Sequence, residues 1–331
     1  MASPLFSEDS EDKWKQAAEA AYDIIKQKTD LGLDLVPYPQ IFNDVNNQKA
    51  EVILYRPTGE SGDFEKANFP IGVEGGKTST CPTQNLMEAY DMKDGTPFVW
   101  NNQSNPYDNR DPRMKYTIVC NEMKWPVDPV EIWEGGTNGL PLQNATTTGY
   151  YLKKYVNNTI SFEAGSTVTK KQHNWVLFRY GEILLNYAEA MINAFHDPNY
   201  KDAVYNMSAR EAVNQIRGRT NISLPGFPSD ITEKDFVKRL KNERRVELAF
   251  EGHRFWDVRR WKELGQTANI YGVKITKNNE VISYEKFLLE TRAVTDNMYF
   301  YPIPNTERFK NPNLGQNPGC LLYTSPSPRD A

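Results

Sequence analysis

The chain has 331 residues, of which 39% are hydrophobic, 25% charged and 12% aromatic, as in a globular protein rather than a disordered one. Lys and Arg number 39 against 43 Asp and Glu, and this balance argues against a nucleic-acid-binding protein, which usually carries a basic surface. No apolar run approaches the ~18–20 residues of a membrane span, and 3 Cys and 3 His are too few for a disulfide scaffold or a histidine-rich metal site.

Residues 7–29 predict an amphipathic helix. Trp14, Ala18, Ala21 and Ile25 recur at spacings of three and four, and acidic residues crowd the N-terminal end, where the helix dipole favours them. Such an apolar stripe needs a partner, and the sequence supplies no helix immediately after it. We therefore expect this part of the chain to contribute one helix of a helical repeat, within residues 1–29.

Residues 30–172 contain many turn-forming pairs with Gly and Pro and few periodic segments. Short strands are expected at 51–55, 117–119 and 150–155. Because long loops in a compact domain usually carry function, we expect this loop-rich region to form the ligand side of the protein.

The pattern then becomes helical, and we expect 173–319 to form a C-terminal helical scaffold. An apolar face predicts a helix at 178–194. Ser208 and Glu211 form a capping box, which predicts the start of the next helix at 209–219. These two helices would form one tetratricopeptide-like pair.

A longer helical stretch covers 232–264, where Gly252 is expected to separate two helices. Residues 299–304 predict a short aromatic strand or extended segment, followed by an Asn- and Pro-rich run.

The last residues, 320–331, have neither a helical nor a strand period, and up to the final residue they match what a common sequencing adapter encodes in one reading frame. We expect them to be a non-native tail and 1–319 to be a single domain.

Two familiar ligand motifs are incomplete. The segment 72–79 (GVEGGKTS) resembles a phosphate-binding loop, but its first glycine has three residues, instead of four, between it and the Gly-Lys pair. His173, His196 and His253 lie far apart, and no HExxH or paired CxxC motif is present. We therefore expect no phosphate loop, no metal and no cofactor.

The most distinctive segment is 243–261 (ERRVELAFEGHRFWDVRRW), in which Glu243, Glu247 and Glu251 recur at helical spacing. One interpretation makes Glu247 and Glu251 the acid and base of a glycoside hydrolase, since carboxylates one turn apart can satisfy the ~5–10 Å separation that hydrolysis requires. Against it, the interleaved arginines would keep both carboxylates ionised, whereas a general acid needs a raised pKa.

The favoured interpretation of this segment is structural: an arginine–glutamate lattice that ties helices together. Ion-pair networks of this kind commonly imitate catalytic sites. The expected arginine partners, and the aromatic residues around which the lattice would form, are Arg244, Arg254, Arg260, Phe250, Phe255, Trp256 and Trp261.

Large aromatic residues in the Gly- and Pro-rich loops are the best candidates for ligand binding. The apolar faces of sugars stack on such rings, while neighbouring amides hydrogen-bond the hydroxyl groups. For any single ring, core packing is the more common role. The candidate ligand-binding residues are Phe98, Trp100, Asn101, Asn102, Trp125 and Trp133.

Four segments of the helical half occur in a fixed order: FRYGEILLNYAEAMINA (178–194), AREAVNQIRGRTNI (209–222), VKRLKNERRVELAFEGHRFWDVRRW (237–261) and YFYPIPNTE…NPNLGQNPG (299–319). Four more precede them: ASPLF (2–6), CPTQNLMEAYDMKDG (81–95), YDNRDPRMKYTI (107–118) and TTTGYYLKKY (146–155). Together these segments resemble the SusD/RagB family of outer-membrane nutrient-binding lipoproteins.

The resemblance implies a mainly α-helical, SusD-like fold, in which tetratricopeptide-like helix pairs support a loop-rich region with a few short strands. It also implies a non-catalytic, lipid-anchored protein on the extracellular face of the outer membrane in Bacteroidetes. Such a protein binds an oligosaccharide, polysaccharide or other nutrient and delivers it to a SusC-like TonB-dependent porin. The family's lipid-modified Cys and first helical repeats are absent from this sequence, so we expect 1–319 to lack the N-terminal part of its domain.

The resemblance also bears on individual residues. The family's arginines and acids in 107–118 and 243–261 build its fold, which favours a structural network here. Its sugar-contacting loop residues vary, so the six candidates named above rest on the residues alone. A helical-repeat scaffold that binds other proteins is a further alternative to glycan binding.

Overall fold

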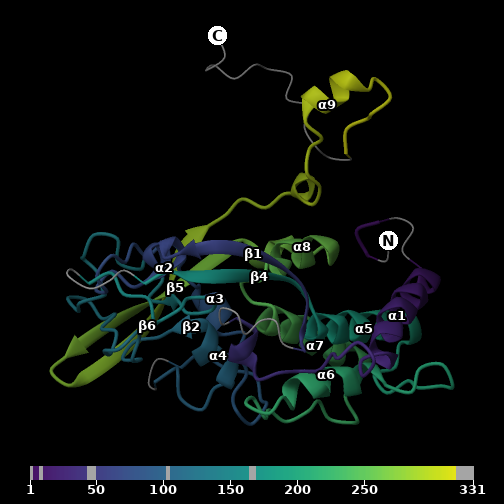
Figure 1. Ribbon diagram of the computed structural model, residues 1–331, viewed down its shortest axis with the longest axis horizontal. Coiled ribbons are helices and arrows are strands. Elements are labelled where there is room, and N and C mark those ends of the chain that lie inside the picture. The colour runs from purple at the N-terminus through teal and green to yellow at the C-terminus, as the bar shows by residue number, and fades with distance from the viewer. Residues whose placement is uncertain (1–2, 7–9, 43–49, 102–104, 164–168, 318–331) are drawn as a thin grey trace.

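The longer helices gather on one side of the molecule, and most of the strands and loops lie on the other (Figure 1). The C-terminal segment with α9 (Asn305–Lys310) stands away from the body. This computed structural model describes residues 3–6, 10–42, 50–101, 105–163 and 169–317. The expected non-native tail and Asn102 lie outside the described residues.

The helical side is built from α1 (Glu11–Lys26), α5 (Tyr180–Phe195), α6 (Ala209–Arg217) and α7 (Glu233–Glu247). Helix α5 packs against the other three, and most of its side chains are buried. The predicted helices and the pairing of α5 with α6 are confirmed. Helix α1 joins that pair directly, since Tyr22 stacks on Tyr187 with ring centroids 5.4 Å apart.

Local signals begin and end these helices where the sequence predicts. The Ser208 hydroxyl accepts from the amide of Glu211, whose carboxylate accepts in return from the amide of Ser208 at 2.8 Å. The Thr232 hydroxyl caps α7 in a similar way, accepting an amide at 3.1 Å. Gly252 separates α7 from α8 (His253–Arg260) with φ of +85°, a conformation that residues with a Cβ rarely adopt.

The described strands pair as three antiparallel two-stranded sheets. The pairs are β1 (Val52–Ser61) with β4 (Lys171–Arg179), β2 (Ile118–Val119) with β3 (Tyr151–Leu152), and β5 (Asn269–Asn278) with β6 (Val281–Thr291). Short helical turns complete the fold: η1 (Tyr38–Ile41), α2 (Asp63–Asn68), α3 (Gln84–Met87), α4 (Pro112–Thr117), η3 (Leu264–Thr267) and η4 (Asp296–Met298). The short strands expected in the loop-rich region are therefore confirmed in place.

The expected helical character of 173–319 is wrong over 173–179, which belong to β4, and over 269–291, which form the β5–β6 hairpin. Its strands pair Asn278 with Val281, and Asn279 adopts φ of +55° in the turn between them. A left-handed Asn in a two-residue connection is a hairpin signal that helical periodicity does not detect. Residues 299–304 form no strand in the described chain.

Aromatic side chains fill the core of the strand side. The Tyr107 ring packs edge to face on Tyr150 and Tyr284, with centroids 6.2 and 5.3 Å apart. The Tyr150 hydroxyl donates to Oε1 of Gln84 at 2.6 Å, so the polar end of this buried ring is satisfied. These rings give the surrounding loops a packed base.

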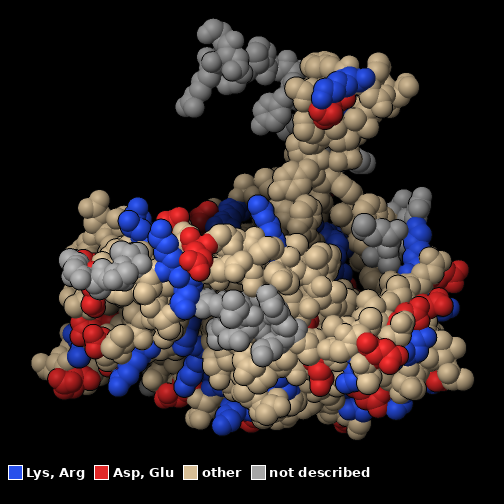
Figure 2. All heavy atoms as spheres, in the orientation of Figure 1, with Lys and Arg blue, Asp and Glu red and all other residues tan. Residues whose placement is uncertain are grey.

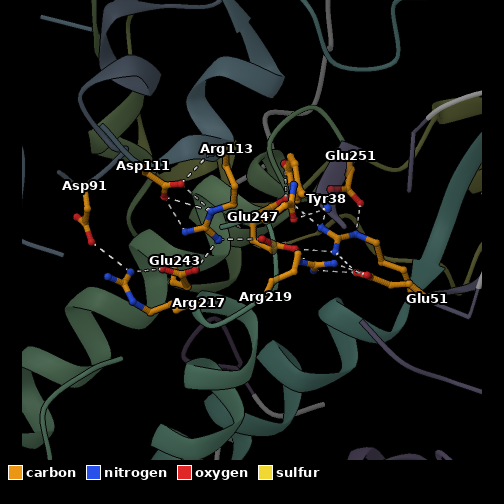
Figure 3. A network of polar contacts seen from close by, with 12 residues as sticks. Tyr38, Glu51, Asp91, Asp111, Arg113, Arg217, Arg219, Glu243, Glu247 and Glu251 are labelled. Carbon is orange, nitrogen blue, oxygen red and sulfur yellow. Dashed lines mark hydrogen bonds and ion pairs between the residues drawn. The ribbon is translucent and has the colours of Figure 1, made fainter. Parts of the chain in front are cut away.

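A buried network of arginines and acids joins the two sides (Figure 3). At its centre Glu247, on α7, accepts from Arg179 and Arg219 through Oε1 and from Arg113 through Oε2, each at 2.8 Å. One turn earlier, Glu243 accepts from Arg113 at 2.5 Å and from Arg217 at 2.7 Å. None of these side chains is more than 3% exposed.

The network connects segments that are distant in the sequence. Glu51, just before β1, accepts from Arg179 at the end of β4 at 2.8 Å and also pairs with Arg219. Asp111 caps α4 and pairs with Arg113 at 2.8 Å. Glu251, in the turn after α7, pairs with Arg179 at 2.7 Å. Each guanidinium therefore ties a loop or strand end to the α7 region.

The lattice is confirmed, but its expected partners are wrong. Arg244 pairs with Asp257, Arg260 with Glu189 and Asp257, and Arg254 hydrogen-bonds Gln266. Phe250, Phe255 and Trp256 are exposed by 36% or more, and of the expected rings only Trp261 is buried. Spacing within one segment cannot reveal arginines that arrive from other parts of the chain.

The arginines control the charge of the central carboxylates. Burial alone would raise the pKa of Glu247, but the charges of the three surrounding arginines outweigh it and hold this pKa far below its usual range. The pKa values of Glu243 and Glu251 are also lowered, again because neighbouring cations outweigh the effect of burial. All three carboxylates are therefore ionised at neutral pH.

We expect Glu247→Gln to lower the free energy of unfolding by about 3–5 kcal/mol, because it leaves buried arginines without their shared counter-charge. Guanidinium unfolding curves measure this change. Glu134→Gln is the matched control, since its 3.3 Å pair with Lys274 has both side chains 48% exposed and is worth at most about 1 kcal/mol. Equal losses in the two variants would contradict a central role for Glu247.

Acid should destabilise the protein through the same carboxylates. In the unfolded chain these glutamates become protonated near their ordinary pKa of 4.5. In the folded protein their pKa values are lowered, so they stay ionised to a lower pH. Their stabilisation is therefore complete above pH 4.5 and is lost as the pH falls through the folded pKa values. The unfolding free energy of Glu247→Gln, measured from pH 5 to 3, should fall less steeply than that of the unsubstituted protein, by up to about 1.4 kcal/mol per pH unit. Parallel slopes would exclude this linkage.

Candidate functional site

A cleft of about 910 Å³ opens on the strand side among three loops, 69–74, 125–138 and 158–163. We call it the aromatic cleft, because the rings of Phe69, Trp125 and Phe162 line it. Phe69 and Phe162 meet edge to face with centroids 6.1 Å apart, although they are distant in the sequence. The cleft thus has an apolar wall assembled from separate loops.

Polar side chains surround these rings. They are Glu74, Asp128, Glu131, Thr137, Asn138, Asn158, Thr159, Ser161 and Glu163. Asn138 has a structural task, because its Oδ1 accepts from the amide of Gly72 at 2.8 Å. Asp128 is exposed at the tip of its loop. Rings beside carboxylate, amide and hydroxyl groups suit a ligand with apolar faces and many hydroxyls.

The loop that carries Trp125 is a tight hairpin. The amide of Glu122 donates to the carbonyl of Val130 at 2.8 Å, and the amide of Trp125 donates to the carbonyl of Asp128 at 2.9 Å. The Trp125 side chain is 7% exposed, and no described residue accepts a hydrogen bond from its Nε1. The hairpin therefore fixes the position of this ring in the wall of the cleft.

The other described candidates do not line the aromatic cleft. Phe98 and Trp100 contact each other edge to face at 6.4 Å, and the Arg110 guanidinium lies 3.6 Å over the Phe98 ring. Asn101 is exposed beside them in the sequence. Trp133 is half-buried beneath a lysine ammonium of β5, 4.3 Å from its ring centroid. The structure therefore does not unite the six candidates in one site.

Phe69, Phe162 and Asp128 were not among the candidates. Phe162 lies in a segment rich in Asn, Ser and Thr, which is the kind of setting that selected Trp100. Phe69 precedes a Pro-Ile-Gly turn and carries a similar signal. Their meeting in one cleft depends on tertiary packing, which loop composition does not predict.

The interpretation of Glu247 and Glu251 as a catalytic pair is wrong. Both side chains are at most 2% exposed and form ion pairs with buried cations. Burial alone would raise both pKa values, but the surrounding cations outweigh it and lower them. A general acid needs a proton near neutral pH and access to its substrate, and neither carboxylate has them.

The described residues contain no group of three or more His, Cys, Asp or Glu side chains that could hold a metal ion. Within those residues there is also no helix whose length and apolar character would let it cross a bilayer. Cys120 is a buried free thiol, and burial raises its pKa to about 12.

Solved structures share this fold. A SusD-like protein from Bacteroides fragilis superposes with a TM-score of 0.73 at 25% identity, over 92% of this chain and 62% of that one. A second protein from the same species, described as a SusD-like carbohydrate-binding protein, has a TM-score of 0.73 at 24% identity, over 92% of this chain and 61% of its own. The chain thus spans less than two thirds of either structure.

Sequence comparison agrees. SusD-like protein P2 of Formosa agariphila is 30% identical over 162 residues, which are 47% of this chain and 28% of that protein. These relatives are named as SusD-like proteins, and one of them is described as carbohydrate-binding. The model of the SusD family matches residues 40–319. The chain therefore belongs to the SusD family.

Proposed function

We propose that this protein binds an oligosaccharide or polysaccharide at the cell surface, without catalysis, and delivers it to a SusC-like TonB-dependent transporter. The observation that carries the proposal is the aromatic cleft, in which Phe69, Trp125 and Phe162 lie among carboxylate, amide and hydroxyl groups. Family membership adds support, since one relative with the same fold is described as carbohydrate-binding.

The cleft suits a sugar on two counts. Apolar ring faces of a sugar stack on aromatic side chains, and its hydroxyls donate to carboxylates such as those of Asp128 and Glu131. Each good aromatic contact adds roughly 0.5–1.5 kcal/mol beyond burial, so affinity would come from several weak contacts along a chain.

Delivery to a transporter and location at the outer membrane extend the proposal from the site to the whole protein. Both rest on membership of the SusD family. They fit a protein that holds its ligand and does not transform it, because the buried acids of α7 serve the fold. Copurification of the protein with a TonB-dependent porin from its native cells tests this part separately.

Substitution in the aromatic cleft should weaken glycan binding. We expect Asp128→Ala combined with Phe162→Ala to lower affinity by about tenfold, the sum of one lost stacking contact and one lost hydrogen bond. Calorimetry against a panel of plant and algal polysaccharides measures the change. Trp256→Ala is the control, since this ring is 59% exposed on α8 and does not line the cleft.

The control should bind within about twofold of the unsubstituted protein, because exposed residues outside the site contribute little. If the cleft variant binds every glycan as tightly as the control, the cleft is not the site. If the unsubstituted protein binds no glycan in the panel but captures proteins, the scaffold alternative replaces this proposal.

A further inference from the structure

A second cleft, of about 460 Å³, lies between α7 and the loop 88–98, with α8 and η3 at one end. Its lining contains six cationic side chains: Lys234, Lys238, Arg239, Lys241, Arg245 and Arg254. Only three acidic side chains line it: Glu88, Asp91 and Glu263. We call it the basic cleft. It contrasts with the rest of a chain whose formal net charge is −4, and with the face in Figure 2, where cationic and acidic side chains interleave.

The three acids are already engaged. Glu88 pairs with Lys286 of β6 at 2.8 Å, and Asp91 pairs with the buried Arg217 at 3.2 Å. Neither Lys286 nor Arg217 lines the cleft. Within the lining, Asp91 also lies 3.8 Å from Arg239, and Glu263 pairs with Lys241 at 2.5 Å. Four of the six lining cations therefore have no ion pair with a described carboxylate: Lys234, Lys238, Arg245 and Arg254.

Two of the arginines have only neutral partners among the described residues. Nη2 of Arg245 donates to the carbonyl of Asn85 at 2.8 Å, and Nη2 of Arg254 donates to Oε1 of Gln266 at 2.8 Å. Both side chains are half-buried. Burial, and after it the charge of the neighbouring Arg254, lower the pKa of Arg245 to about 10. Two cations held together without a direct ion-pair partner make a favourable position for an anion.

The lysines extend this positive charge along α7. Lys234, Lys238, Lys241 and Arg245 follow one another at spacings of four, three and four, so they share one face of the helix. The face covers about 16 Å at 1.5 Å per residue. No carboxylate of the described chain pairs with Lys234 or Lys238, both of which are exposed. A row of charges suits a polymer with an anionic group on successive units better than a single small ion.

The wall opposite α7 carries an aromatic ring. Phe98 lines the cleft with Pro97, and the Arg110 guanidinium covers the Phe98 ring at 3.6 Å. Three backbone carbonyls fix that guanidinium, at 2.6, 2.7 and 2.7 Å. The cleft therefore combines a row of cations with a rigidly held apolar surface of the kind that sugars contact.

From this arrangement we propose that the basic cleft binds the carboxylate or sulfate groups of an acidic polysaccharide. The inference rests on the proposed glycan-binding function and narrows its ligand class. Phe98, predicted from the sequence as a sugar contact, then serves the basic cleft.

The test compares charged and neutral polymers on the same protein. Polygalacturonate probes carboxylates and dextran sulfate probes sulfates, with unmodified dextran as the neutral counterpart. We expect one or both anionic polymers to bind, more tightly at 50 mM than at 500 mM NaCl, because salt screens exposed charges. Lys234→Gln combined with Lys238→Gln should weaken that binding roughly 3- to 30-fold, while both lysines are dispensable for folding.

Lys26→Gln combined with Lys28→Gln is the control, with the same loss of charge on and just after α1, at side chains 49% and 41% exposed. It should leave affinity for the anionic polymers within about twofold, as expected of charges far from a binding site. Equal weakening in both pairs, or no binding of either anionic polymer, overturns the inference. If neutral glycans still bind through Asp128 and Phe162, the proposed function stands without it. If no glycan binds at all, both fall.

Discussion

The carboxylate of Glu247 lies where arginines from three separate segments meet, and the rest of the fold depends on that meeting. Arg113 comes from the loop-rich side, Arg179 from the end of β4, and Arg219 from the segment after α6. In a dry interior each of these charges would be costly alone, so the segments are stable only together. One ionised side chain of α7 thereby fixes the loops of the strand side relative to the helices.

The two faces of α7 have different roles. The buried face of α7 carries Glu243 and Glu247, whose charges are neutralised within the fold. Its outer face presents lysines and Arg245 to the basic cleft. Because the acids are committed to packing, the proposed ligand contacts fall to the loops around Trp125 and Phe162 and to the outer face of α7. Such an arrangement allows the loops to vary without disturbing the scaffold.

The sequence predicts those parts of the fold that local signals control. The capping box at Ser208 and Glu211 and the break at Gly252 are confirmed, because each depends on residues only a few positions apart. The partners of Glu247 were missed, since Arg179 and Arg219 lie 68 and 28 residues away and no spacing within 243–261 reveals them. The β5–β6 hairpin could have been predicted from the sequence, because Asn279 lies in its turn.

In the candidate site, too, the sequence indicates single loop residues but not which loops meet in the folded protein. Of the six candidates, Trp125 alone lines the aromatic cleft among the described residues, and Phe69 and Phe162 complete the cleft from distant loops. Binding of an oligosaccharide in the aromatic cleft is tested most directly by a crystal structure of the protein with that ligand. We expect a sugar ring stacked on Trp125 or Phe162, with a hydroxyl near Asp128. A sugar bound elsewhere, with this cleft empty, would contradict it.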